Sequence, residues 1–203
     1  MQIAVISPES ADPREVDAME GMFSEGLGRY HVRKPTWTEA GLEAWLRTLP
    51  HAWRPRIVLH RHPGLAQRLL LAGTHAGDAG GDADAPGAGR SCHDLATLRG
   101  RIGRYGSLFF GPIFPSLSKP GYGPAPDFPW GELSAALKGD RGAAGTRVLA
   151  IGGITAGGLA RCRELGFDGA AAMGAVWGEA DPVRAFAALR DAARKLEEAR
   201  DAA

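Results

Sequence analysis

Charged and polar side chains follow most of the short apolar segments of this sequence. They are His31 and Arg33, His60 and Arg61, His75 and Asp78, and Ser91 and His93. If the apolar segments are parallel strands of one barrel, their carboxyl ends meet at one mouth and these side chains share a pocket. Because the set is cationic and rich in hydrogen-bond donors, it indicates a site for a phosphorylated small molecule.

Glycine-containing turns follow the last two apolar segments. Residues 148–151 read Val-Leu-Ala-Ile and precede Gly152-Gly153, and residues 169–173 precede Gly174-Ala175. Without a Cβ the backbone turns sharply and lets an anion approach its N–H groups. The simpler alternative is that these glycines only allow tight turns between strand and helix. The pattern favours a phosphate site at Gly152, Gly153, Gly174 and Ala175.

Strand and helix patterns alternate along the whole chain, which predicts a mostly parallel sheet. Strands are expected at 2–6, 29–33, 56–59, 74–76, 90–92, 107–110, 148–151 and 169–173. Helices are expected at 14–27, after the cap Thr38, and at 63–71, 94–98, 130–137, 156–165 (with Thr155 as cap) and 182–200. Residues 78–89 and 111–128 read as loops rich in Gly or Pro, the first of them replacing a helix. We therefore predict an α/β chain with one domain, residues 1–203, folded as a (β/α)8 TIM barrel with its phosphate site after the last two strands.

Composition excludes several classes of function. The chain has 203 residues, a formal net charge of +1 and no basic tail, so nucleic acid is not an expected partner. No apolar run is long enough to span a bilayer, and the N-terminal residues do not read as a signal peptide. Cys92 and Cys162 do not form a disulfide framework. We expect a cytoplasmic protein without membrane partners; the sequence leaves a homo-oligomer open.

Four motifs, in order along the chain, resemble one family. They are Tyr-His-Val-Arg-Lys-Pro at 30–35, Gly-Arg-Ser-Cys-His-Asp-Leu at 89–95, Phe-Phe-Gly-Pro-Ile-Phe-Pro-Ser-Leu-Ser-Lys at 109–119 and Ala-Ile-Gly-Gly-Ile-Thr at 150–155. The sequence is similar to the thiamine phosphate synthase / thiazole tautomerase superfamily, of which it resembles a divergent member. The resemblance implies a (β/α)8 barrel. It also implies an enzyme of thiamine biosynthesis, either a transferase that couples a hydroxymethylpyrimidine pyrophosphate to a thiazole phosphate or an isomerase that aromatises the thiazole.

The resemblance also implies roles for individual residues. The amides of Gly152, Gly153, Gly174 and Ala175 correspond to those that hold the thiazole phosphate. Arg33, Ser116, Ser118 and Lys119 correspond to groups that meet the pyrophosphate, and Ser91 to a serine beside the pyrimidine. We expect catalytic roles for Arg33, Ser91, His93 and Lys119. Substrate contacts are expected from His31, His60, Ser116, Ser118 and the four residues of the phosphate site.

Mg²⁺ is the cofactor that the resemblance implies, held on the pyrophosphate by aspartates after the third and fourth strands. Here Arg61 and Ala79 stand at those positions, and a cation at Arg61 repels Mg²⁺. Asp78, displaced by one residue, is the weak candidate for a metal ligand. Mg²⁺ is therefore a doubtful cofactor for this chain.

Three functions stay open on the sequence alone. The first is a synthase that binds a phosphorylated thiazole and a pyrimidine pyrophosphate. The second is a metal-free thiazole tautomerase, which needs a base; the family's histidine after the sixth strand is replaced by Pro112, so His31, His60, His75 or His93 must serve. The third is a non-catalytic binder of thiazole phosphate or thiamine phosphate. The histidines are too scattered along the chain, with too few Cys or Asp partners, to predict a zinc site.

Overall fold

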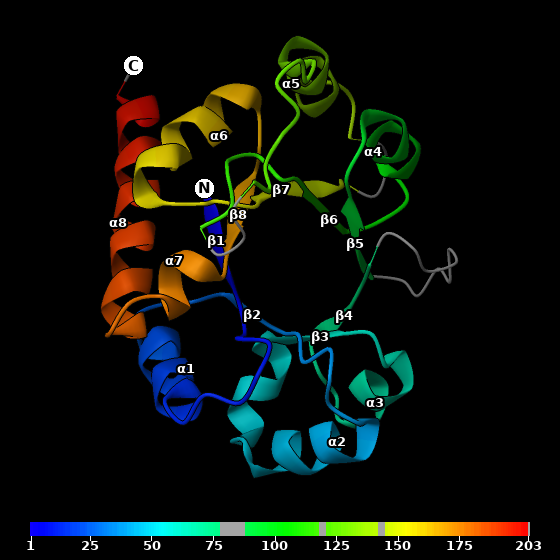
Figure 1. Ribbon diagram of the computed structural model, residues 1–203, viewed down its shortest axis with the longest axis vertical. Coiled ribbons are helices and arrows are strands. Elements are labelled where there is room, and N and C mark those ends of the chain that lie inside the picture. The colour runs from blue at the N-terminus through cyan, green and yellow to red at the C-terminus, as the bar shows by residue number, and fades with distance from the viewer. Residues whose placement is uncertain (78–87, 118–120, 142–144, 203) are drawn as a thin grey trace.

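Eight parallel strands pair in chain order and close on themselves, β8 pairing with β1 (Figure 1). The computed structural model describes residues 1–77, 88–117, 121–141 and 145–202. The strands are β1 (Gln2–Ile6), β2 (Arg29–Val32), β3 (Ile57–His60), β4 (Gly73–Ala76), β5 (Gly89–Cys92), β6 (Ser107–Phe110), β7 (Arg147–Ile151) and β8 (Gly169–Ala172). The predicted (β/α)8 TIM barrel is thereby confirmed.

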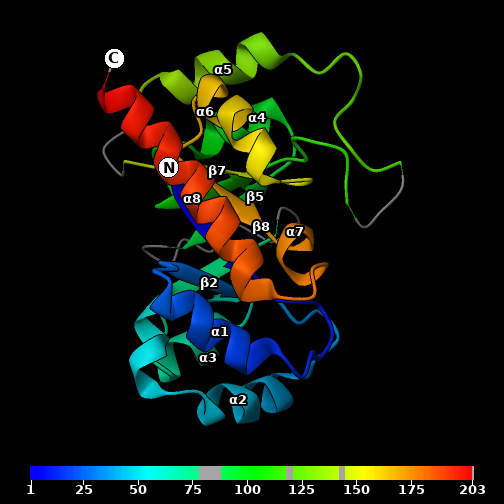
Figure 2. The ribbon, with the colours of Figure 1, turned by 90° about the vertical axis from the view of Figure 1, so that its left-hand side faces the viewer.

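Helices surround the strands as a ring, also in chain order (Figure 1). They are α1 (Glu15–Ser24), α2 (Glu39–Thr48), η1 (His51–Arg56), α3 (Pro63–Arg68), α4 (Leu95–Arg101), α5 (Trp130–Lys138), η2 (Ala156–Gly158), α6 (Leu159–Leu165), α7 (Gly174–Trp177) and α8 (Pro182–Asp201). Residues 78–87, where a glycine-rich loop is predicted, lie outside the described residues. In the side view, α8 runs along α1 and α6 and begins beside α7 (Figure 2).

Side-chain caps fix the starts of three helices. Thr38 Oγ1 accepts from the Gly41 amide at 3.2 Å and starts α2, and Asp94 Oδ1 accepts from the Thr97 amide at 2.8 Å and starts α4. Asp181 caps α8 in the same way, with Pro182 at the first helical position. The predicted cap at Thr155 is wrong, because the chain first makes the 3-10 turn η2 and the Thr155 side chain accepts no capping bond.

The core has two parts. The larger lies between the strands and the ring of helices, and the smaller fills the barrel interior with Ala4, Ile6, Phe109, Leu149 and Ala171. These five residues come from β1, β6, β7 and β8. On β2, β3 and β4 the interior instead receives three imidazole rings, which approach the Phe109 ring. The barrel interior is therefore apolar on the side of β6, β7, β8 and β1 and contains histidine on the side of β2, β3 and β4.

No helix among the described residues combines the length and hydropathy that crossing a bilayer requires.

Candidate active site

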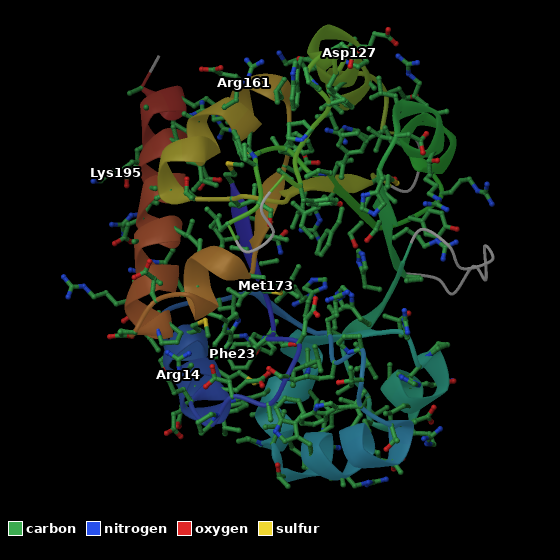
Figure 3. All side chains as sticks on the ribbon, viewed as in Figure 1. Arg14, Phe23, Asp127, Arg161, Met173 and Lys195 are labelled. Carbon is green, nitrogen blue, oxygen red and sulfur yellow. The ribbon has the colours of Figure 1, made fainter. Side chains whose placement is uncertain are left out.

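A pocket of about 370 Å³ opens at the carboxyl ends of the strands. Its lining includes nine of the predicted site residues: Arg33, His60, Ser91, His93, Ser116, Gly152, Gly153, Gly174 and Ala175. Met173, which follows β8 and also lines the pocket, lies near the middle of the ring, whereas Arg161 and Lys195 lie outside it (Figure 3). Ser118, Lys119 and Asp78 lie outside the described residues.

Backbone conformation, rather than side chains, shapes the pocket wall after β7 and β8. Gly152 and Gly153 have φ of 91° and 65°, the left-handed region that residues with a Cβ rarely adopt. Within the described part of the chain, the amides of Gly152, Gly153, Gly174 and Ala175 have no hydrogen-bond acceptor. Four open N–H donors on one pocket wall are a suitable site for a phosphate.

The segment after β6 is hydrogen-bonded to this wall. The Ile113 amide donates to the Ile151 carbonyl at 3.0 Å, and the Phe114 amide donates to the Gly152 carbonyl at 3.1 Å. A Cβ on Gly152 would lie 2.8 Å from the Pro112 Cα, closer than real contacts allow. The segment therefore fixes the position of the glycine pair and depends on the absence of side chains there.

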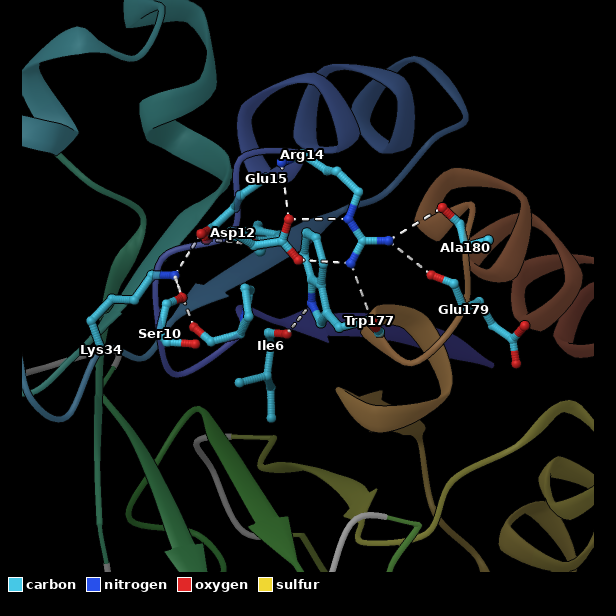
Figure 4. Close-up of polar contacts among 11 residues, drawn as sticks. Ile6, Ser10, Asp12, Arg14, Glu15, Lys34, Trp177, Glu179 and Ala180 are labelled. Carbon is cyan, nitrogen blue, oxygen red and sulfur yellow. Dashed lines mark hydrogen bonds and ion pairs between the residues drawn. The ribbon is translucent and has the colours of Figure 1, made fainter.

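Bonds to β1 and to the segment that follows β1 hold the segment after β8. Trp177 of α7 donates its indole N–H to the Ile6 carbonyl at 2.8 Å (Figure 4). Arg14, which is paired with Asp12, donates to the carbonyls of Glu179 and Ala180 at 3.0 and 3.2 Å. These contacts place Gly174 and Ala175 beside the end of β1 and help to close the barrel at the pocket.

Arg33 lines the pocket directly after β2. Its backbone amide donates to the Ser7 hydroxyl at 2.9 Å, and that hydroxyl donates to the Arg33 carbonyl at 3.1 Å. Its guanidinium forms an ion pair with Glu9, and both side chains are about 40% exposed. An exposed pair of this kind contributes little stability, so Arg33 can exchange Glu9 for a substrate anion.

Lys34, next along the chain, points into the protein instead. Its ammonium group is ion-paired with Glu15 and donates to the carbonyls of Pro8 and Ser10 at 2.8 and 2.9 Å (Figure 4). The Lys34 side chain is fully buried, and Glu15 also accepts from the Tyr30 hydroxyl at 2.8 Å. Burial raises the pKa of Glu15, and Lys34 opposes that shift. Lys34 therefore has a structural role, holding the segment that connects β1 to α1.

Three histidines meet inside the barrel below the pocket. His31 Nδ1 lies 3.2 Å from His60 Nε2, and the His60 and His75 rings stack with centroids 4.6 Å apart. His60 and His75 line the pocket floor, whereas His31, which was predicted to contact substrate, is not among the residues that line the pocket. The ring of His31 lies against Phe109 in the barrel interior. The prediction that the histidines are too scattered for a metal is wrong for these three, because adjacent parallel strands bring them together.

Burial keeps these imidazoles neutral. Desolvation lowers the pKa of His31 to about 3 and lowers the pKa values of His60 and His75 well below the ordinary value. Neighbouring charges, including the other histidines, add to the shift. Near neutral pH all three rings therefore present uncharged nitrogen atoms.

Ser91 and His93 occupy the pocket wall after β5. Ser91 Oγ lies 3.0 Å from His75 Nε2, which ties the wall to the histidines below. His93 Nδ1 donates to the Gly111 carbonyl at 2.7 Å, which leaves Nε2 with a lone pair. Because His93 is exposed and lines the pocket, Nε2 can accept a proton from a bound molecule.

The described residues do not fit Mg²⁺. Among those that line the pocket, Glu9 is the only carboxylate, and it is paired with Arg33. Arg61 takes the place after β3 where the resemblance implies a metal-binding aspartate. Since Mg²⁺ needs several oxygen ligands, this cationic wall suits the phosphate groups of a substrate better than it suits the metal.

Glu9 and Tyr122 line the pocket but were not singled out from the sequence. Glu9 stands three residues beyond β1, so the rule that functional groups follow barrel strands could have found it. Tyr122 lies in the long segment between β6 and α5, at the right of Figure 2, where no periodicity indicates which residues turn inward. Its carbonyl accepts from the Ser116 amide at 2.7 Å, which folds that segment back over the pocket.

Sequence comparison finds similar proteins that match most of this chain. The sequence is 29% identical to the thiamine-phosphate synthase of Chromobacterium violaceum over 198 residues, which are 91% of this chain and 92% of that protein. It is 29% identical to the thiamine-phosphate synthase of Methylobacillus flagellatus over 190 residues, 87% of each protein. No protein-family model matches the sequence.

Solved structures of similar proteins share the barrel fold. The thiamine phosphate pyrophosphorylase of Bacteroides thetaiotaomicron superposes with a TM-score of 0.77 and 25% identity, over 96% of this chain and 98% of that one. The thiamine phosphate pyrophosphorylase of Pyrococcus furiosus, at 20% identity, shares the fold with a TM-score of 0.77 over 96% of each chain. In sequence and in fold, the chain is similar to these thiamine phosphate synthases and pyrophosphorylases.

Proposed function

We propose that this protein is a transferase of thiamine biosynthesis with thiamine phosphate synthase-like activity. Its substrates are a thiazole phosphate and a hydroxymethylpyrimidine pyrophosphate. The thiazole nitrogen attacks the pyrimidine methylene carbon, a carbon–nitrogen bond forms, the carbon–oxygen bond breaks, and pyrophosphate leaves. This assignment extends to this chain the thiamine-phosphate synthase activity for which the two similar proteins are named.

One observation carries the proposal. Open amides after β7 and β8 and the guanidinium groups of Arg33 and Arg61 line a single pocket. A thiazole phosphate needs the first group and a pyrophosphate leaving group needs the second. Loops that only connected strands to helices would need neither two cations nor unpaired N–H donors in one pocket.

The roles of the residues follow from their positions. The amides of Gly152, Gly153, Gly174 and Ala175 hold the thiazole phosphate and so orient the ring nitrogen. Arg33 and Arg61 stabilise negative charge as the carbon–oxygen bond breaks. Ser91 and Ser116 line the space between these groups and donate to the substrates. The resemblance implies further pyrophosphate contacts from Ser118, Lys119 and a Mg²⁺ ion. The roles given above to the described residues do not depend on these contacts.

The test is direct. Purified protein is incubated with both substrates, with and without Mg²⁺, and thiamine phosphate and pyrophosphate are quantified. Formation of the two products in equal amounts supports the transferase. Stabilisation of the protein by thiazole phosphate with no product under either condition would instead support the non-catalytic binder.

Replacing Arg33 with Gln should lower kcat/KM for the pyrimidine pyrophosphate roughly 10- to 100-fold, because one charge-assisted contact is lost. The Tm should change little, since the Arg33–Glu9 pair is exposed. Arg47→Gln is the matched control: Arg47 is also exposed and paired with one glutamate, but it lies on α2, outside the pocket. Equal kcat/KM values for the two variants would exclude Arg33 from the reaction.

A thiazole tautomerase is the second candidate, and His93 favours it. Its ring is bonded to the Gly111 carbonyl, one residue from Pro112, where the resemblance expects the tautomerase histidine. His93 Nε2 could therefore serve as the base that the sequence lacks at Pro112. Protein-dependent exchange of the thiazole ring proton into D₂O, abolished in His93→Gln, would support this function; no exchange would exclude it.

A further inference from the structure

The three histidines below the pocket form a second candidate site, to which the proposed reaction assigns no role. His31, His60 and His75 come from the neighbouring strands β2, β3 and β4. One ring nitrogen from each residue lies within 4.8 Å of the other two. His31 Nδ1 and His60 Nε2 are 3.2 Å apart, close to the roughly 3.3 Å that separates two nitrogens on a tetrahedral zinc with bonds of about 2.05 Å.

We propose that His31, His60 and His75 bind one divalent transition-metal ion of the Zn²⁺ class at the floor of the pocket. Three imidazoles with a fourth position open toward a pocket are a ligand set that catalytic zinc sites use. The set contains no oxygen ligand, so it selects Zn²⁺, Co²⁺ or Ni²⁺ rather than Mg²⁺. The proposal does not depend on the transferase activity, because metal binding can be measured without substrate.

An unpartnered nitrogen supports this assignment. His75 is fully buried, and its Nδ1 has no hydrogen-bond partner among the described residues. A buried nitrogen without a partner carries a desolvation penalty. A metal ion accepting its lone pair would remove that penalty.

The surroundings of His75 suit a metal ligand. With Nε2–H donating to Ser91 Oγ, the Nδ1 atom carries the lone pair, as when an outer hydrogen bond fixes the tautomer of a ligating histidine. Gly89 on β5 leaves room for the ring, since a Cβ there would lie 2.6 Å from His75 Nδ1. The ring is therefore held between a hydroxyl on one nitrogen and a glycine beside the other.

Arg33, one of the cations that line the pocket, is ion-paired with Glu9, so its charge is partly offset.

The direct experiment uses the full chain without an affinity tag, stripped with chelator and then dialysed against Zn²⁺. We expect one Zn²⁺ per chain by elemental analysis, retained in excess Mg²⁺. Co²⁺ in place of Zn²⁺ should give visible ligand-field absorption typical of a low-coordinate nitrogen site. Absence of stoichiometric Zn²⁺, together with the absence of that Co²⁺ absorption, would overturn the proposal and leave a hydrogen-bonded histidine cluster.

Variants locate the ion. His60→Asn should weaken Zn²⁺ binding by more than about 100-fold, whereas His51→Asn, an exposed residue on η1, should not. Gly89→Ala keeps all three histidines but displaces the His75 ring, so it should also weaken binding; Gly77→Ala, where a Cβ meets nothing within 4 Å, is its control. Zn²⁺ binding that is equal in His60→Asn and His51→Asn would overturn the assignment, even if Gly89→Ala fails to fold.

Discussion

Replacing Lys34 with Met should lower the free energy of unfolding by about 3–5 kcal/mol, because it leaves the Glu15 carboxylate buried without its cation. Chemical denaturation monitored by circular dichroism measures the change. Lys195→Met, on the exposed side of α8, is the matched control and should change stability by less than about 0.5 kcal/mol. Equal stability of Lys34→Met and the control would contradict the structural role of Lys34.

The loss should depend on pH in a defined direction. Without Lys34, burial raises the pKa of Glu15 further in the folded state, so the folded variant binds a proton that the unfolded chain has released. The loss of stability in Lys34→Met should therefore be largest near neutral pH. It should shrink as the pH falls toward about 4.3, the ordinary pKa of Glu. The double variant Lys34→Met/Glu15→Leu should recover much of the stability, since it removes both buried charges.

Replacing Gly153 with Ala should reduce affinity for thiazole phosphate by roughly 100-fold. The new Cβ would collide with the Pro115 carbonyl oxygen, which is backbone and cannot rotate away, and the φ of 65° adds strain of about 1–2 kcal/mol. The segment after β6 must then move, and the open amides move with it. Isothermal titration with thiazole phosphate measures the effect.

Gly157→Ala is the control for that variant. Gly157 lies four residues further along, is exposed, and a Cβ there meets nothing within 4 Å. The Gly157→Ala variant should bind thiazole phosphate with the same affinity as the unsubstituted protein. If Gly153→Ala also retains full affinity while remaining folded, the glycine pair is only a turn.

The barrel could be predicted from the sequence because each strand is a short apolar run followed by a helix of distinct period. Residues 107–110 and 148–151 are unambiguous in this respect, and Thr38 and Asp94 mark helix starts through short-range bonds. Thr155 is a threonine like Thr38, but its side chain does not cap a helix, because the glycines at 157 and 158 allow a 3-10 turn first. The local sequence pattern alone does not show which threonine caps a helix.

The pocket could be predicted only in part. Positions after strands identified Arg33, the glycine pair and His93, because the ends of parallel strands must meet. The same rule misplaced His31, which sits before the end of β2 and points to a deeper layer of the interior. Whether a buried ring meets two others depends on strand register and barrel closure, which the sequence does not state. The buried role of Lys34, beside the pocket-lining Arg33, depends likewise on contacts with the segment after β1.

The central claim is that the amides beyond β7 and β8 bind the phosphate of a heterocyclic substrate. A crystal structure of the protein soaked with thiazole phosphate tests it most directly. We predict the phosphate within hydrogen-bond distance of the Gly152, Gly153, Gly174 and Ala175 amides, with the ring directed toward Arg33. A phosphate bound elsewhere, with these four amides bonded to water or protein, would contradict the account.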